Sequence, residues 1–365
     1  MTWISDYKSD YFKSDLAAGI TVAVLLIPQG MAYALIAGLP PLYGLYAALV
    51  PQIVYAILGT SRQLAVGPVA MDSLLVAAGL GSLSIVNPSQ YIQMAILLAL
   101  LMGALQLILG LLRMGFIVSF LSKPVIKGFT AAAAIIIGLS QMKHLLGISI
   151  TQSNKIQEFI ASVFQTQAPV HLPTLALGLG SILLLIGLKK WTPKVPSGIL
   201  AVLLGILGVY FGKLDQMGVA VVGSIPSGLP SFSLPRSDWE TIRTLVPIAL
   251  TIALVAYMEA VSVAKAIQEK HKNYEINPNQ ELIALGASNI IGSLFQSYPT
   301  TGGFSRTAVN DQAGAKTGVS ALVSALIVAI ILSFFTHWFF YLPKAVLGAI
   351  IIVAVVNLID FKYTS

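Results

Sequence analysis

Three ionisable side chains lie within apolar stretches of this sequence: Asp72, Glu259 and Arg306. A charge at the centre of a membrane-spanning helix costs about 2.5–3.5 kcal/mol, so such residues are expected where they have a function. Arg306 carries a permanent positive charge and a planar set of donors that matches an oxyanion, and the hydroxyls of Ser305 and Thr301 are further donors. This combination predicts a binding site for an anion.

The two carboxyl groups have different expected roles. We expect Glu259 to take up and release a proton that travels with the anion, and Asp72 to be a hydrogen-bonded carboxyl at a packing face. As an alternative, Asp72 is a second coupling group or a sodium ligand, a role for which Thr301 is the other candidate. Arg306 also has an alternative role, a fixed salt bridge to Glu259, Asp72 or Asp311 in which the acid only neutralises the arginine.

Two further polar side chains share one face of the first apolar stretch. Gln29 and Tyr33 are four residues apart, after Pro28, which disturbs a helix. Because glutamine offers hydrogen-bond donors within lipid, we expect this face to contact the cargo.

Apolar runs long enough to cross a bilayer recur along the whole sequence, separated by Gly, Pro and charged residues. They predict an all-α polytopic membrane protein. The predicted spans number about twelve: 16–36, 42–58, 67–80, 91–112, 125–146, 172–188, 197–212, 243–268, 279–293, 303–312, 318–335 and 343–359.

Two of these spans, 67–80 and 303–312, are too short to cross as helices, which need about 20 residues at about 1.5 Å each. Gly-Pro or Gly-Gly stands at the start of each, so each is expected to cross partly as extended chain and to begin its helix near the bilayer midplane. Two half-helices with facing N-termini would direct free N–H groups at one shared pocket. The pair also indicates an inverted repeat, 1–212 and 213–365. Ordinary loops between re-entrant pieces are the alternative.

Composition excludes several classes of protein. With 56% hydrophobic and 10% charged residues and a mean hydropathy of +0.86, the chain is not a soluble globular protein. Its 21 Lys and Arg residues are scattered between spans, which argues against nucleic-acid binding. Without cysteine, and with no nucleotide-binding loop, zinc-ligand spacing or nucleophile–base arrangement, we expect neither an enzyme nor a metal or cofactor site, although a proton or sodium ion is expected as a co-transported ion.

The distribution of basic residues predicts the orientation. Most of the Lys and Arg residues between spans fall on the side of the N-terminus, which is therefore expected to be cytoplasmic. Residues 1–15 are polar and mixed in charge, unlike a cleaved signal peptide. We expect an integral protein of the plasma (inner) membrane.

A resemblance to a known family begins at Pro41. The segment Pro41-Leu42-Tyr43-Gly44-Leu45-Tyr46-Ala47-Ala48, followed by Tyr55 and by Gly59-Thr60-Ser61-Arg62, resembles the signature of the sulfate permease (SulP) family. Further resemblances lie in 65–70, in 279–286 and in 292–296 leading to Ser305-Arg306, so the likeness covers nearly the whole chain.

The resemblance implies an anion transporter or exchanger with two inverted repeats of seven spans, arranged as core and gate domains. Such a protein is a homodimer in its full-length form, works by an elevator-like motion and has broken third and tenth spans. Glu259 occupies the acidic position used for cation coupling. Carried over by position, the anion site consists of Gln29, Tyr33, Val69, Ala70, Gly303, Phe304, Ser305 and Arg306.

The family pattern continues with two further spans and a cytoplasmic STAS domain, so we expect the chain to be a truncated form of a longer permease. The predicted function is secondary active transport of a small inorganic anion across the lipid bilayer, with sulfate moving together with a proton. A sodium-coupled bicarbonate transporter, or an exchanger of chloride, bicarbonate or dicarboxylates, is the related alternative. A passive anion channel or a voltage-responsive protein is the alternative from a different class.

Overall fold

The computed structural model describes residues 6–83, 85, 87–116, 135, 138–139, 141–148, 170–191, 197–235, 237–272 and 274–356. Helices dominate this part of the chain, and strands are confined to two residue pairs. Five helical segments are long and apolar enough to cross a membrane: Tyr11–Ile36, Pro41–Leu58, Pro88–Leu111, Trp239–His271 and Val319–Phe339. These observations confirm the predicted all-α membrane fold. Most of the predicted span 125–146 and the end of the predicted span 343–359 lie outside the described residues.

The chain divides into two compact units, each drawn from both halves of the sequence. Unit 1 combines Met1–Ser122 with Gly228–Phe334, and unit 2 combines Lys123–Ser227 with Phe335–Ser365. The predicted repeats, 1–212 and 213–365, are continuous in sequence and do not coincide with these two units. The boundary between the repeats stays a prediction.

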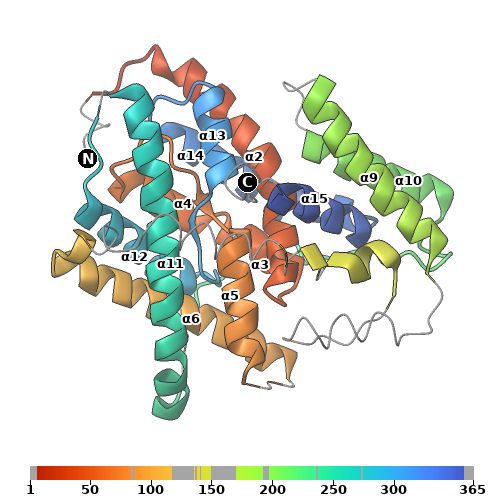
Figure 1. Ribbon diagram of the computed structural model, residues 1–365, viewed down its shortest axis with the longest axis horizontal. Helices are drawn as coiled ribbons and strands as arrows, with labels where there is room; N and C mark the ends of the chain where they lie inside the picture. Colours follow the sequence, from red (N-terminus) through yellow and green to blue (C-terminus); the bar gives the residue numbers. More distant parts are fainter. Residues whose placement is uncertain are drawn as a thin grey trace, which may run out of the picture. The chain divides into compact units, whose positions relative to one another are not determined.

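Unit 1 contains the two predicted half-helices and the long spans that pack around them (Figure 1). Its elements are α2 (Tyr11–Ile36), α3 (Pro41–Ala47), α4 (Val50–Leu58), β1 (Val66–Gly67), α5 (Ala70–Gly81), α6 (Pro88–Leu111), α11 (Trp239–His271), α12 (Pro278–Leu294), β2 (Thr301–Gly302), α13 (Phe304–Gln312) and α14 (Val319–Ile330).

Several of these helices start where local sequence chemistry requires it. Asn87 and Asn277 precede α6 and α12, and the side chain of each accepts a hydrogen bond from a backbone N–H in the first turn. Pro88 and Pro278 follow them at the first helical position, where a missing N–H costs nothing. Asp238 caps α11 in the same way. The sequence therefore specifies these three helix starts locally.

Close contact between α6 and α12 depends on two glycines that face each other. A Cβ on Gly103 would lie 2.7 Å from the carbonyl oxygen of Gly286, and a Cβ on Gly286 would lie 2.6 Å from the backbone nitrogen of Leu107. Small residues allow helix backbones to approach closely, which is a main source of helix association in membranes. The buried side chains of α5, α6 and α11 form the adjoining apolar core, with Leu98, Met102 and others fully enclosed.

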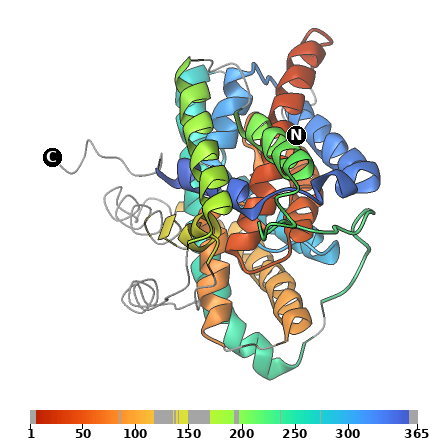
Figure 2. The ribbon, with the colours of Figure 1, turned by 90° about the vertical axis from the view of Figure 1, so that its right-hand side faces the viewer.

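A buried carboxylate joins the start of α2 to the start of α14. Asp15 is fully buried and accepts hydrogen bonds from Lys316 N at 2.6 Å, Thr317 N at 3.1 Å and Thr317 Oγ1 at 2.5 Å. The two helices then run side by side, with α2 in red and α14 in blue (Figures 1 and 2).

Two predicted spans differ from the expected continuous helices. The span 42–58 is interrupted at Ala48 and Leu49, because Pro51 in the first turn of α4 cannot donate a backbone hydrogen bond to the preceding turn. The span 318–335 ends as a π-helical turn, η2 (Ile331–Phe335), which is followed by a 3-10 turn, η3 (Thr336–Phe339).

In unit 2 the described helices are α9 (Leu172–Trp191), α10 (Ser197–Gly212) and α15 (Lys344–Val356), which contact one another. The segment after α10 is tied to the chain before α15 by a bridge between Val221 and Pro343 and by a hydrogen bond of 2.9 Å from Val222 N to Leu342 O. The segment that follows α10 is therefore anchored at this point.

Candidate functional site

The two half-helices start side by side. Strands β1 and β2 pair in antiparallel fashion, with Val66 opposite Gly302 and Gly67 opposite Thr301. α5 begins three residues after β1, and α13 begins two residues after β2. The N-termini of these short helices therefore lie together, as the sequence predicts, and their carboxyl ends point away from the strands.

The first turns of both half-helices keep donors available. The residues that precede them, Val69 and Gly303, form no side-chain cap, in contrast to the asparagines before α6 and α12 among the described helix starts. An uncapped start leaves backbone N–H groups and the positive end of the helix dipole for a ligand. Helix starts of this kind bind anions.

Arg306 extends from α13 across to the start of α5. Its side chain is only 2% exposed, and Nη1 donates a hydrogen bond of 2.5 Å to the carbonyl oxygen of Pro68. The buried Nε and Nη2 atoms have no hydrogen-bond partner among the described residues. Guanidinium donors without a partner are costly in a buried site unless a ligand accepts from them. The arginine is thus held in place by one donor and has others free for an anion.

The alternative of a fixed salt bridge for Arg306 is wrong for the described part of the chain. Asp311 pairs instead with Lys270 Nζ at 2.5 Å and with the ring of His271, at the end of α11. Within the described residues, neither Glu259 nor Asp72 comes within salt-bridge distance of the arginine. Glu259 does lie near enough to Arg306 for the two charges to interact.

Glu259 reaches the site from α11. The hydroxyl of Thr301 donates a hydrogen bond of 2.8 Å to the carbonyl oxygen of Ala256, which fixes β2 against α11 one turn before Glu259. The buried Oε2 atom of Glu259 has no partner among the residues that the structure describes. Thr301 is therefore used in packing, whereas the carboxyl group of Glu259 is left without a fixed partner.

The expectation of a hydrogen-bonded carboxyl at position 72 is wrong. Asp72 lies in the first turn of α5 and is fully buried, but neither carboxyl oxygen has a hydrogen-bond partner among the described residues. Its neighbour Ser73 contacts the hydroxyl of Tyr298 at 3.1 Å. The possible coupling roles of Asp72 and Thr301 stay predictions.

The other predicted anion-site residues surround the two helix starts in different ways. Tyr33 on α2 is 5% exposed and interacts electrostatically with both Arg306 and Glu259, and the buried Oε1 atom of Gln29 has no partner among the described residues. Val69 and Ala70 are buried at the start of α5, and Gly303 is buried at the start of α13. Phe304 and Ser305, in contrast, are exposed at the start of α13.

Two groups at the site were not singled out by sequence reasoning. One is the Pro68 carbonyl, which holds Arg306 and carries no side-chain signal. The other is Tyr298, fully buried next to β2 and bonded to Ser73. The sequence signal for Tyr298 was its position in the polar segment before the broken span 303–312, because a buried phenol requires a hydrogen-bond partner.

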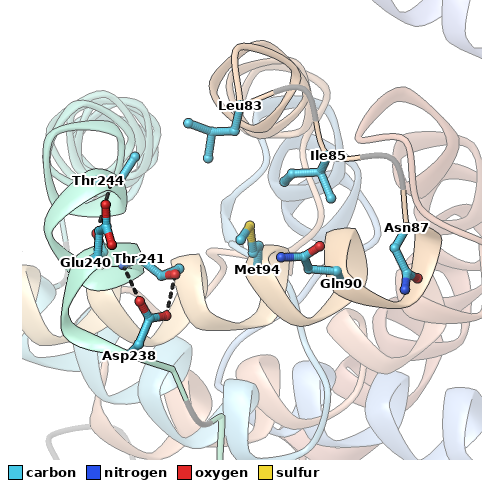
Figure 3. Close-up of a pocket in the computed structure, with 9 residues that line it drawn as sticks. All are labelled: Leu83, Ile85, Asn87, Gln90, Met94, Asp238, Glu240, Thr241 and Thr244. Carbon is cyan, nitrogen blue, oxygen red and sulfur yellow. Dashed lines mark hydrogen bonds between the residues drawn. The ribbon is translucent and has the colours of Figure 1, made fainter.

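A separate cavity of about 500 Å³ lies at the far end of α5 (Figure 3). It is lined by the turn after α5, the start of α6 and the start of α11, including Asp238 and Glu240, and its described lining contains no cationic side chain. Hydrogen bonding from the Thr241 side chain keeps the pKa of Asp238 below its usual value. The two carboxylates in this lining disfavour an anion there.

Comparison with known proteins agrees with the geometry. The family model described as the sulfate permease family matches residues 12–364. Sulfate transporter 4.1, chloroplastic, of Arabidopsis thaliana is 47% identical over 98% of this chain and 53% of its own length. Probable sulfate transporter Rv1739c of Mycobacterium tuberculosis is 38% identical over 98% of this chain and 63% of its own length. The chain thus spans about half to two thirds of these relatives.

Solved structures show the same architecture. The murine Solute Carrier 26 anion transporter Slc26a9, in the inward-facing state, is 28% identical with a TM-score of 0.91, covering 100% of this chain and 64% of that chain. The transmembrane domain of the cyanobacterial bicarbonate transporter BicA has a TM-score of 0.87 at 24% identity, over 98% of this chain and 91% of that chain, and supports the fold alone. From its match over nearly the full length and from these relatives, the chain is an integral membrane protein that belongs to the sulfate permease family, a family of transporters rather than of enzymes.

Proposed function

We propose that this chain is a secondary active transporter of small inorganic anions, and that it carries sulfate together with a proton. The observation that carries the proposal is the buried Arg306, anchored to Pro68 with further donors free, at the paired and uncapped starts of α5 and α13.

The chemistry of this site favours a doubly charged oxyanion. The first-turn N–H groups of two helices and the planar guanidinium offer directional donors to several oxygens at once. Each interaction is stronger in a dry site than in water, which offsets the loss of the anion's hydration. The curated relatives with 47% and 38% identity are named as sulfate transporters, which supports sulfate as the cargo.

Proton coupling is assigned to Glu259. Its carboxyl group is near Arg306 but not paired with it, so both the protonated and the ionised form are accessible within one site. A proton carried with sulfate reduces the negative charge that moves through the low-dielectric interior and against the membrane potential. No described ion pair has to be broken for Glu259 to take up this proton.

Counterflow in proteoliposomes tests the proposal. Vesicles containing the chain are loaded with unlabelled sulfate, and entry of labelled sulfate is measured with and without a gradient of pH or of sodium. We expect saturable entry that an acidic exterior stimulates and that sodium does not change.

Other outcomes would assign another function. Saturable, sodium-driven uptake of bicarbonate without sulfate uptake would contradict the proposed cargo and coupling ion. A steep, continuous anion current would indicate a channel. The elevator-like motion and the homodimer stay predictions.

A further inference from the structure

The most unusual buried group in unit 1 is the carboxyl of Asp72. It is fully enclosed in the first turn of α5, and neither of its oxygens has a hydrogen-bond partner among the residues that the structure describes. The other two fully buried carboxylates in the described residues, Asp15 and Glu281, both have hydrogen-bond donors. Asp15 accepts three hydrogen bonds, and Glu281 accepts three from Tyr55 and Thr60.

This difference has a direct physical consequence. An ionised carboxylate without hydrogen bonds or a paired cation is strongly disfavoured in a low-dielectric interior, whereas a neutral carboxylic acid is tolerated there. Arg306 is the cation on the facing half-helix, but no described ion pair joins it to Asp72. The state of Asp72 that fits these surroundings is the protonated one.

The neighbours of Asp72 connect it to the proposed transport site. Glu259 on α11 and Tyr298 before β2 are near enough to interact with it electrostatically. Tyr33 on α2 and Arg306 on α13 interact in turn with Glu259 and Tyr298. Two carboxyl groups therefore belong to one cluster, and a negative charge on one disfavours a negative charge on the other.

From this geometry we propose that Asp72 is a second proton site, so that two protons, one on Asp72 and one on Glu259, accompany each sulfate ion. This inference rests on the proposed function and specifies its stoichiometry. Both acids take up a proton on the side of entry and release it on the side of exit. Two positive charges then balance the two negative charges of sulfate, and the transport cycle moves no net charge.

The stoichiometry is measured as the sulfate accumulation at which net flux stops. At zero membrane potential, a gradient of one pH unit should support about a hundredfold accumulation with two protons and about tenfold with one, since each proton contributes a factor of ten per pH unit. We expect about a hundredfold for the unaltered chain, without dependence on an imposed potassium diffusion potential. Asp72→Asn should reduce the ratio to about tenfold and make it voltage-dependent. Asp72→Glu, which retains a carboxyl group, should restore the higher ratio.

Infrared difference spectroscopy tests the proton on Asp72 without requiring transport. The reconstituted protein should show the C=O band of a protonated carboxylic acid that is lost in Asp72→Asn. Asp15→Asn is the matched control and should leave that band in place, because Asp15 already accepts three hydrogen bonds.

The outcomes separate this inference from the proposed function. A tenfold ratio in the unaltered chain, a ratio unchanged by Asp72→Asn, or an infrared band unaffected by that substitution would overturn the second proton site while leaving sulfate transport in place. A lack of saturable sulfate uptake would overturn the proposed function instead, and the infrared band would then decide the state of Asp72. Size-exclusion elution of each variant shows whether it is folded.

Discussion

The Nη1 atom of Arg306 donates a hydrogen bond of 2.5 Å to the carbonyl oxygen of Pro68, and this bond joins the two half-helices of unit 1. Pro68 lies between β1 and α5, whereas Arg306 lies in the first turn of α13. The guanidinium is thereby fixed over both helix starts, with Nε and Nη2 left unpaired among the described residues. A ligand that accepts from these atoms meets a donor set that is already oriented.

Replacing the guanidinium with an ammonium group tests this arrangement. Arg306→Lys keeps the positive charge. Its ammonium group, however, lacks the planar set of donors with which a guanidinium can donate to the Pro68 carbonyl and to a ligand at the same time. Loss of a hydrogen bond to a charged group costs about 1.5–3 kcal/mol, so we expect the KM for sulfate to rise about ten- to a hundredfold. Concentration-dependent uptake into proteoliposomes measures the change.

The matched control for this substitution is Arg113→Lys, because Arg113 is exposed after α6. It should leave the KM unchanged. An equal effect of both substitutions, or an unchanged KM in Arg306→Lys, would show that the guanidinium geometry does not bind the anion.

Gly303 provides a second test, in which the arginine itself stays. A Cβ at this position would lie 2.8 Å from Nη2 and 2.9 Å from Cζ of Arg306. Because the end of a flexible side chain gives way before the backbone does, we expect Gly303→Ala to fold, to displace the guanidinium and to weaken sulfate binding by about 1.5 kcal/mol, roughly tenfold in KM.

Gly180→Ala is the comparison for this variant. A Cβ on Gly180, in α9, would meet nothing within 4 Å, and alanine favours a helix over glycine. Sulfate uptake by Gly180→Ala should equal that of the unaltered chain. If Gly303→Ala does the same, the position of the guanidinium is not critical.

Much of the fold follows from hydropathy and helix signals. The apolar runs predict the long helices, and Asn-Pro before α6 and α12 marks their starts. The interruption at Leu49 and the π-helical turn at Ile331 were not predicted, because the apolar pattern continues across both positions, although Pro51 accounts for the first of them. The assembly of each unit from both halves of the sequence is likewise a matter of long-range contacts.

The candidate site was predicted in part. Gly-Pro and Gly-Gly indicated the two broken spans, and Arg306 stood out as a charge in an apolar setting. The Pro68 carbonyl could not be found, since any residue carries one, and the absence of a partner for Asp72 among the described residues depends on three-dimensional packing. Sequence reasoning identifies which residues are unusual in a membrane, but not which of them pair.

Asp15 provides a test of structure instead of transport. Asp15→Asn replaces one acceptor oxygen with an NH₂ group that faces the donors of Thr317 and Lys316. An unsatisfied buried polar group costs about 1–3 kcal/mol, so the free energy of unfolding should fall by about that amount. Thermal unfolding in detergent measures the loss. Asp10→Asn, at an exposed position before α2, should unfold at the same temperature as the unaltered chain.

The last prediction concerns the proposed coupling proton. Glu259→Gln retains a polar side chain of nearly the same size but cannot exchange a proton. We expect exchange of sulfate across the membrane to continue in part, because Arg306 and the helix starts are unchanged, while accumulation driven by a pH gradient falls sharply. Exchange and net accumulation are measured in the same vesicle preparation, so a folding defect would reduce both together.

Glu269→Gln supplies the control on the same helix, since Glu269 is exposed near the end of α11 and lies two turns or more beyond the site. It should accumulate sulfate as the unaltered chain does. Undiminished pH-driven accumulation in Glu259→Gln would place proton coupling on another residue. In a variant that elutes as a folded protein on size exclusion, a loss of exchange equal to the loss of accumulation would instead make Glu259 part of the anion-binding structure. A residue that only carries the proton is not required when sulfate moves in both directions without a gradient.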